Sequence, residues 1–75
     1  MDRSIVEMAA AKIKVSVAEA EQHCKEVPEI NGYYFWNPIR GGLSVLINSE
    51  GEMLAATSSV NYDRHLEAFL GGKRN

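Results

Sequence analysis

The side chains in this sequence best suited to covalent chemistry are one cysteine and two histidines, Cys24, His23 and His65. A cysteine nucleophile needs a base within hydrogen-bonding distance. His23 is adjacent to Cys24 and points about 100° away from it on a helix, so only His65, on a distant element, can serve as that base. Cys24 also falls on an apolar stripe, and small buried cysteines are common. We therefore predict no catalytic residue, and a small Cys/His enzyme is the third of three functions considered.

The same three residues make a poor metal site. No two cysteines have the spacing that zinc sites require, because Cys24 is the only one. The chain also lacks the full glycine patterns of nucleotide-binding loops. We predict no metal ligand and no cofactor.

The segment Arg40-Gly41-Gly42 and the basic pair Lys73-Arg74 offer a possible anion site. Paired glycines let backbone N–H groups approach an anion, and an arginine binds phosphate through two N–H groups. A plain turn and a solvated chain end explain the same residues. Anion or nucleic-acid binding through Arg40, Lys73 and Arg74 is therefore the second function considered.

Four consecutive aromatic residues, Tyr33 to Trp36, carry the strongest functional signal. Side chains alternate between the faces of a strand, so Tyr33 and Phe35 share one face while Tyr34 and Trp36 share the other. One pair must enter the core, and the sequence leaves open which one. An aromatic pair left on the surface is typical of an interface. The alternative is that helices and loops cover both pairs. The candidate interaction residues are Tyr34, Trp36, Arg40 and Leu46.

A long amphipathic helix is expected over residues 4–26. Ser4 and Glu7 form a capping box, and Pro28 disfavours helical backbone at the preceding residue. Apolar residues recur at steps of three and four along one stripe: Ile5, Ala9, Ile13, Val17, Ala20, Cys24 and Val27. An alternative divides the segment into a short helix, a strand and a second helix. It rests on the alternation over residues 12–17 and on a second capping box, Ser16 with Glu19.

Three strands are expected next, over residues 32–37, 42–48 and 52–57. Tyr33 to Trp36 is a run of strong β-formers bounded by Asn31-Gly32 and Asn37-Pro38, and the side chains from Leu43 to Asn48 alternate between two faces. Gly51 suits a short hairpin loop before the third strand. A second helix is expected over residues 61–70, with Asn61 among its possible N-caps. Residues 71–75 are expected to form a frayed tail.

These elements predict a single α+β domain over residues 1–75, in the order helix, three-stranded antiparallel meander, helix. We expect both helices on one face of the sheet, as a two-layer sandwich. This order of elements resembles that of double-stranded-RNA-binding domains. Such domains need lysines at the start of the last helix, whereas this chain has Asp63 there. The resemblance is therefore limited to element order.

Length and charge restrict the partners. A chain of 75 residues has a thin core, and a single cysteine excludes an internal disulfide, so we expect a homodimer or a larger protein partner. The net charge of −2 argues against a general polyanion binder. No apolar run is long enough to cross a membrane, and no signal-peptide pattern begins the chain, so we expect a cytoplasmic protein without a membrane partner.

The sequence therefore favours a small non-enzymatic protein-interaction module of unknown specific role. We expect it to self-associate through an exposed face or edge of the sheet. Its partner, ligand and strand order cannot be predicted from these residues.

Overall fold

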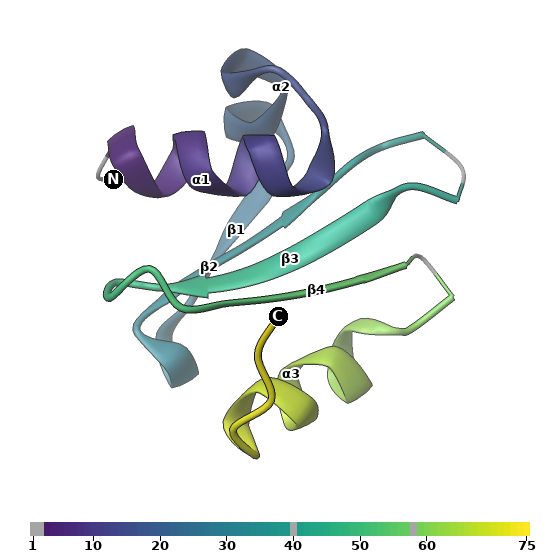
Figure 1. Cartoon of the computed structure of the whole chain (residues 1–75). Helices are drawn as coiled ribbons and strands as arrows, with labels where there is room; N and C mark the ends of the chain where they lie inside the picture. The colour runs from purple at the N-terminus through teal and green to yellow at the C-terminus, as the bar shows by residue number, and fades with distance from the viewer. Residues whose placement is uncertain (1–2, 40, 58) are drawn as a thin grey trace.

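The computed structural model describes residues 3–39, 41–57 and 59–75 of the chain (Figure 1). Arg40, a candidate in both predicted sites, lies outside these residues. The elements, in chain order, are α1 (Arg3–Ile13), α2 (Val17–Gln22), β1 (Cys24–Val27), the 3-10 turn η1 (Pro28–Ile30), β2 (Gly32–Trp36), β3 (Leu43–Asn48), β4 (Met53–Thr57) and α3 (Tyr62–Leu70). The α+β class is therefore confirmed, whereas the long helix and the three-stranded sheet are corrected.

The expected helix over residues 4–26 is broken after Ile13. Lys14 adopts a left-handed backbone conformation with a φ of 64°, which ends α1. Ser16 then caps α2, and its hydroxyl oxygen accepts the N–H of Glu19 at 3.1 Å. Ser16 and Glu19 thus mark a helix start, as in the alternative interpretation, but no strand separates the two helices. The apolar stripe continues through the break because both helices pack on the same core.

The C-terminal end of the predicted helix is instead a strand, β1, which pairs antiparallel with β2. Backbone pairing with the aromatic strand outweighs the helical spacing in this segment. The return to β2 is tight, and Asn31 adopts a left-handed conformation there. A Cβ at Gly32 would collide with the backbone carbonyl of Ile47 on β3, so glycine is required at this point.

The four strands form one antiparallel sheet in the order β1-β2-β3-β4. The expected bounds of the last three strands differ from the observed ones by at most one residue at each end. Because the order of elements now contains four strands, the resemblance to double-stranded-RNA-binding domains no longer holds even at that level.

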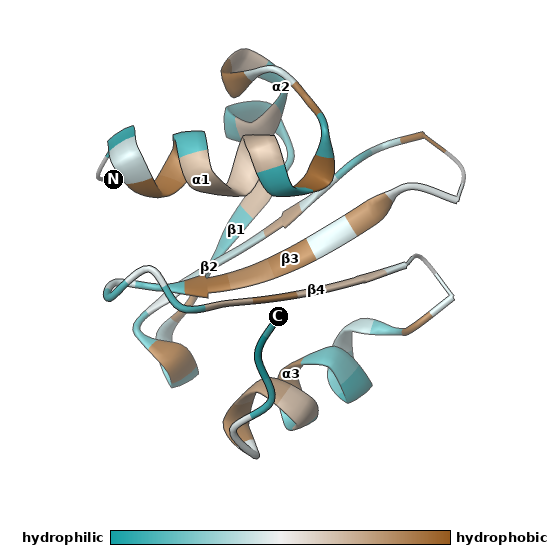
Figure 2. Ribbon diagram, viewed as in Figure 1, coloured by the Kyte–Doolittle hydropathy of each residue, from teal (hydrophilic) through white to brown (hydrophobic). Residues whose placement is uncertain are grey.

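Helices cover both faces of the sheet, so the expected two-layer arrangement is wrong. α1 and α2 lie on one face and α3 lies on the other (Figure 1). The reason lies in β3, most of which is hydrophobic (Figure 2). Val45 and Ile47 face α1, while Leu46 faces α3, and all three are fully buried. A sheet with two apolar faces needs a layer on each.

Two separate cores result. The larger one contains Phe35, which is fully buried beneath α1, so the Tyr33–Phe35 pair is the one that enters it. The smaller one consists of Val27, Ile30, Leu46 and Phe69, with Tyr34 and Tyr62 packed at its margin.

The tail is folded back rather than frayed. After Gly72, which has a φ of 99°, the chain turns from α3 toward β4 (Figure 1). Asn75 there makes backbone and side-chain hydrogen bonds to Met53 and Ala55.

Candidate functional site: an aromatic cleft beside α3

A cleft of about 440 Å³ opens where α3 leaves its face of the sheet uncovered. α3 has nine residues and is about 13 Å long, whereas the six residues of β3 span about 20 Å. The helix therefore covers only part of this face. The cleft lies between the sheet and the first residues of α3, and the side chains that define it are Lys25, Tyr34, Trp36, Ser44, Asn61 and Tyr62.

Three aromatic rings form one wall of this aromatic cleft. The Tyr34 and Trp36 rings lie 5.8 Å apart between centroids, with planes inclined by 29°, because residues i and i+2 of a strand share a face. The Tyr62 ring meets Tyr34 edge-on at 4.9 Å and 84°. Asn61 fixes Tyr62 at the first position of α3 by accepting the N–H of Arg64 at 2.9 Å. The rings are thus held by a strand and a capped helix.

A single ammonium group lies at the rim. Lys25, on β1, places its Nζ 3.7 Å from the centroid of the Tyr62 ring and 6.0 Å from that of Tyr34, within cation–π range. Within the described residues, no carboxylate forms an ion pair with Lys25. The pKa of the Tyr62 hydroxyl is raised above its ordinary value, first by burial and then by the nearby Glu29 carboxylate. Tyr62 is therefore a neutral hydrogen-bonding group at physiological pH.

Several hydrogen-bond donors of the aromatic cleft remain available. In the described part of the chain, no hydrogen bond involves the indole N–H of Trp36 or the hydroxyls of Tyr34 and Tyr62. All three side chains are half-buried. A bound group would therefore meet flat apolar surfaces together with free N–H and O–H donors.

Ser44, which lines the cleft, pairs with the buried side chain of His65 on α3. Ser44 Oγ lies 3.4 Å from His65 Nδ1, and His65 Nε2 lies 2.6 Å from the carbonyl oxygen of Leu54. Because a carbonyl only accepts, Nε2 donates to it, and in the neutral ring Nδ1 accepts from the serine hydroxyl. His65 is 1% exposed and Ser44 is 4% exposed. The pair satisfies polar groups of the interior, and we assign it a structural role.

Two of the four predicted interaction residues lie in the cleft, Tyr34 and Trp36. Leu46 shares their face, as expected, but it is fully buried under Phe69 and does not reach the surface. The sequence interpretation did not include Tyr62 or Lys25 in the site. Tyr62 fell in the helix expected over residues 61–70. Lys25 fell in the C-terminal part of the helix expected over residues 4–26, and that part is a strand in the structure.

Lys73 and Arg74, the two predicted anion-binding residues in the described part of the chain, do not line a common hollow. Lys73 lines a separate shallow hollow on α3 together with Arg64 and Glu67. Arg74 is already engaged, since its guanidinium donates to the Phe69 carbonyl at 2.8 Å and stacks on the Phe69 ring at 3.6 Å. The described residues therefore contain no combined Lys73–Arg74 anion site.

Cys24 and His65 lie on opposite faces of the sheet. Cys24 packs against the core under α1, whereas His65 is buried on the α3 side. The Cys24 Sγ donates to the Glu21 carbonyl at 3.6 Å. Burial raises the pKa of the thiol, and the Glu21 carboxylate adds to the increase. Both effects disfavour the thiolate form, and His65, the base considered for this thiol, lies on the other face of the sheet.

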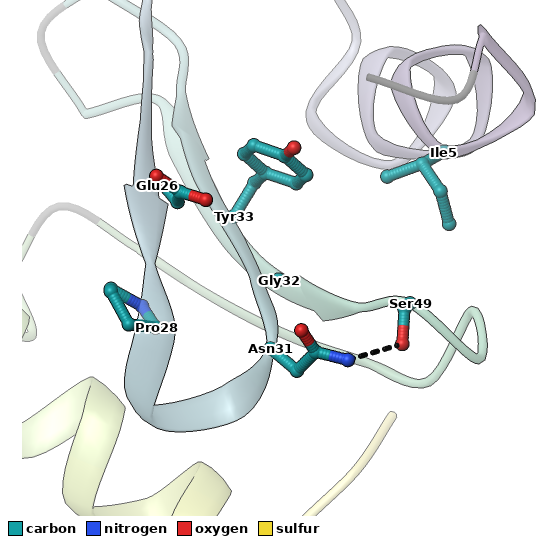
Figure 3. A pocket seen from close by; sticks show the side chains of 7 residues that line it. All are labelled: Ile5, Glu26, Pro28, Asn31, Gly32, Tyr33 and Ser49. Carbon is teal, nitrogen blue, oxygen red and sulfur yellow. Dashed lines mark hydrogen bonds between the residues drawn. The ribbon is translucent and has the colours of Figure 1, made fainter.

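A second cavity, of about 340 Å³, lies at the opposite end of the sheet, beside the first turns of α1 (Figure 3). Glu26 and Tyr33 project from paired positions of β1 and β2, and Ile5 faces them from α1 (Figure 3). Asn31 Nδ2 donates to Ser49 Oγ at 3.1 Å at its edge. Its described lining includes no cation, so the aromatic cleft is the stronger candidate site.

Over the part of the chain that the structure describes, no group of three or more histidine, cysteine or carboxylate side chains is placed to hold a metal ion. None of the helices there has the length and apolar character that crossing a membrane requires.

No family model, curated protein sequence or solved structure matches the chain. The functional argument is therefore based on the geometry of the aromatic cleft.

Proposed function

We propose that this chain is a small non-enzymatic protein-interaction module and that the aromatic cleft is its binding surface. One observation supports the proposal above the others: Tyr34, Trp36 and Tyr62 meet in a single cleft with their N–H and O–H donors free. Tryptophan and tyrosine are the residue types most enriched among those that dominate binding energy at protein interfaces.

The occupant that fits best is an extended segment of a partner protein. An extended or polyproline chain makes no internal hydrogen bonds, so its carbonyls can accept from Trp36 and the tyrosine hydroxyls. A proline or aliphatic side chain can pack against the flat surface that these rings form together. The unpaired ammonium of Lys25 at the rim complements an acidic residue in the same segment. We therefore propose a short, acidic, proline-containing or aliphatic peptide as the ligand.

A selection from a random peptide library on the immobilised chain tests this proposal. The library is first counter-selected on the immobilisation support alone, and Leu70→Ala is the matched control because Leu70 is 59% exposed and lies outside the cleft. We expect selected peptides to bind Trp36→Ala at least about tenfold more weakly than the native chain, the loss typical of an interface hot spot. Binding to Leu70→Ala should be unchanged.

Lys25→Met provides a second readout of the same proposal. This variant keeps the length of the side chain and removes its charge, so the preference for acidic peptides should disappear while aromatic contacts persist. Selected peptides that bind Trp36→Ala as tightly as the native chain, or a selection that enriches nothing over the counter-selection, would contradict the cleft as the binding surface.

A further inference from the structure

The two edge strands of the sheet are protected in different ways. β1 has four residues and carries Lys25 and Glu26, and charged side chains on a short edge strand discourage pairing with another chain. β4 is the opposite edge strand, and its five residues, Met53–Thr57, include no charge. An uncharged edge strand of this kind is a ready template for strand addition.

The outward-facing groups of β4 follow from its pairing with β3. The Asn48 N–H donates to the Glu52 carbonyl at 3.1 Å, so the backbone groups of alternate residues from Glu52 onward face β3. The backbone groups of Met53, Ala55 and Thr57 therefore point away from the sheet. A neighbouring strand would have to bond to these three residues.

Asn75 occupies this edge and imitates a strand. Its side-chain oxygen accepts the Ala55 N–H at 2.7 Å, and its side-chain nitrogen donates to the Ala55 carbonyl at 3.0 Å. Its backbone N–H donates to the Met53 carbonyl at 3.0 Å. One amide group thus pairs with both backbone groups of Ala55, as a residue of a neighbouring strand does in a hydrogen-bonded antiparallel pair.

Arg74 holds Asn75 in place. Its guanidinium stacks on the Phe69 ring and donates to the Phe69 carbonyl of α3, and it lies 3.7 Å from the Glu52 carboxylate before β4. These contacts are partly exposed and involve a single side chain. Detachment of the tail requires the loss of these contacts, which uncovers one face of the Phe69 ring, and the loss of the hydrogen bonds of Asn75.

We propose that the β4 edge is a strand-addition surface for a second copy of this chain, and that Asn75 is its removable cap. Antiparallel pairing about a two-fold axis at Ala55 places Ala55 opposite Ala55 of the second copy and Met53 opposite Thr57. Within Met53–Thr57 no charged side chain opposes another in this register, so the paired strands meet without like-charge repulsion. The two sheets then join into one continuous sheet.

Asn75 and a second copy of the chain compete for the same backbone groups of β4. This competition sets the expected change in the dimerisation constant. Losing the two side-chain bonds of Asn75 weakens capping by about tenfold or more, from the usual net value of a hydrogen bond. Both copies must uncap before they pair. Removing the Asn75 side chain should therefore tighten dimerisation by about the square of that factor, or about a hundredfold.

Analytical ultracentrifugation of the full chain over a concentration series tests the proposal. Asn75→Ala should dimerise at concentrations about a hundredfold lower than the native chain does. Arg74→Ala, which releases the tail without changing the Asn75 side chain, should tighten dimerisation in the same direction. The double variant Asn75→Ala/Thr57→Lys should remain monomeric because it puts a charge on the uncapped edge.

Hydrogen exchange at the Ala55 amide distinguishes uncapping from unfolding. In the monomeric double variant this amide should exchange at least about tenfold faster than in the native chain, while the Val45 amide in the buried β3 stays protected. A native-like dimerisation constant for both Asn75→Ala and Arg74→Ala would overturn the capping role. Dimers of Asn75→Ala that tolerate Thr57→Lys would overturn the β4 edge as the surface.

This surface is separate from the aromatic cleft, and the two proposals fail independently. Trp36→Ala should leave the dimerisation of Asn75→Ala unchanged, and Asn75→Ala should leave peptide binding at the cleft unchanged.

Discussion

Replacing Leu46 by alanine tests the second layer of the fold, which is the feature that shapes the aromatic cleft. Leu46 is fully buried between β3 and α3, in contact with the small core that includes Val27, Ile30 and Phe69. Truncating a fully buried leucine costs about 3–5 kcal/mol through lost burial and the cavity that remains. If this residue faced solvent on an open sheet, the cost would be within about 0.5 kcal/mol.

The expected loss is a large part of the total. A chain of 75 residues has a free energy of unfolding of about 4–11 kcal/mol. Leu46→Ala should therefore lower Tm by about 12–40 °C, as followed by far-ultraviolet circular dichroism. Leu70→Ala is the matched control, because Leu70 is exposed on the same helix that covers Leu46. A Leu46→Ala variant as stable as this control would refute the packing of α3 on the sheet.

Three further outcomes follow from the structure. Gly32→Ala should destabilise the fold by more than about 2 kcal/mol in urea titrations, because its Cβ meets the backbone carbonyl of Ile47; a nearly unchanged midpoint would contradict this close approach. Ser16→Ala should cost about 1 kcal/mol in the same assay through loss of the α2 cap, and Ser16→Thr should restore most of it. Stability should fall as pH rises past about 9, because the pKa values of Cys24 and Tyr62 are raised above their ordinary 9.0 and 10.0, so the unfolded state releases these protons first. The double variant Cys24→Ala/Tyr62→Phe should flatten this alkaline slope, and a slope that survives both changes would refute the assignment.

The sequence predicted secondary structure best where the local residue pattern favours the same element that strand pairing produces in the structure. Turn residues separate the three strands after residue 31, so the bounds of these strands could be predicted closely; they include Asn31-Gly32, Asn37-Pro38, Gly41-Gly42 and Gly51. Residues 24–27 were misassigned because their spacing suits a helix as well as a strand. These residues form a strand because their backbone groups hydrogen-bond to β2 across a short turn. This pairing has no local signal in the sequence.

The only sequence indication of a second helical layer was one residue of β3, Leu46. Leu46 is apolar on the face opposite Val45 and Ile47, and this alternation was visible in the sequence. An apolar residue on the outer face indicates either an interface with another chain or a covering helix of the same chain. The choice depends on the direction in which the chain leaves β4, which the sequence does not encode locally.

Only part of the candidate site could be predicted from the sequence. Tyr34 and Trp36 share a face by strand alternation alone, so their proximity followed from the sequence. Tyr62 and Lys25 reach them from α3 and β1, across the second layer and the unpredicted strand. Residues that meet through tertiary packing of distant elements leave no spacing pattern to detect.

The most direct test of the aromatic cleft uses Trp36 itself, which is the only tryptophan of the chain. Its indole N–H gives one resolved nuclear magnetic resonance signal and its fluorescence reports on one site. During titration with a selected peptide, we predict that this N–H resonance shifts and saturates at one peptide per chain, with a parallel change in fluorescence. If the selected peptide binds the chain but the N–H resonance and the fluorescence of Trp36 both stay unchanged, the proposed function is contradicted.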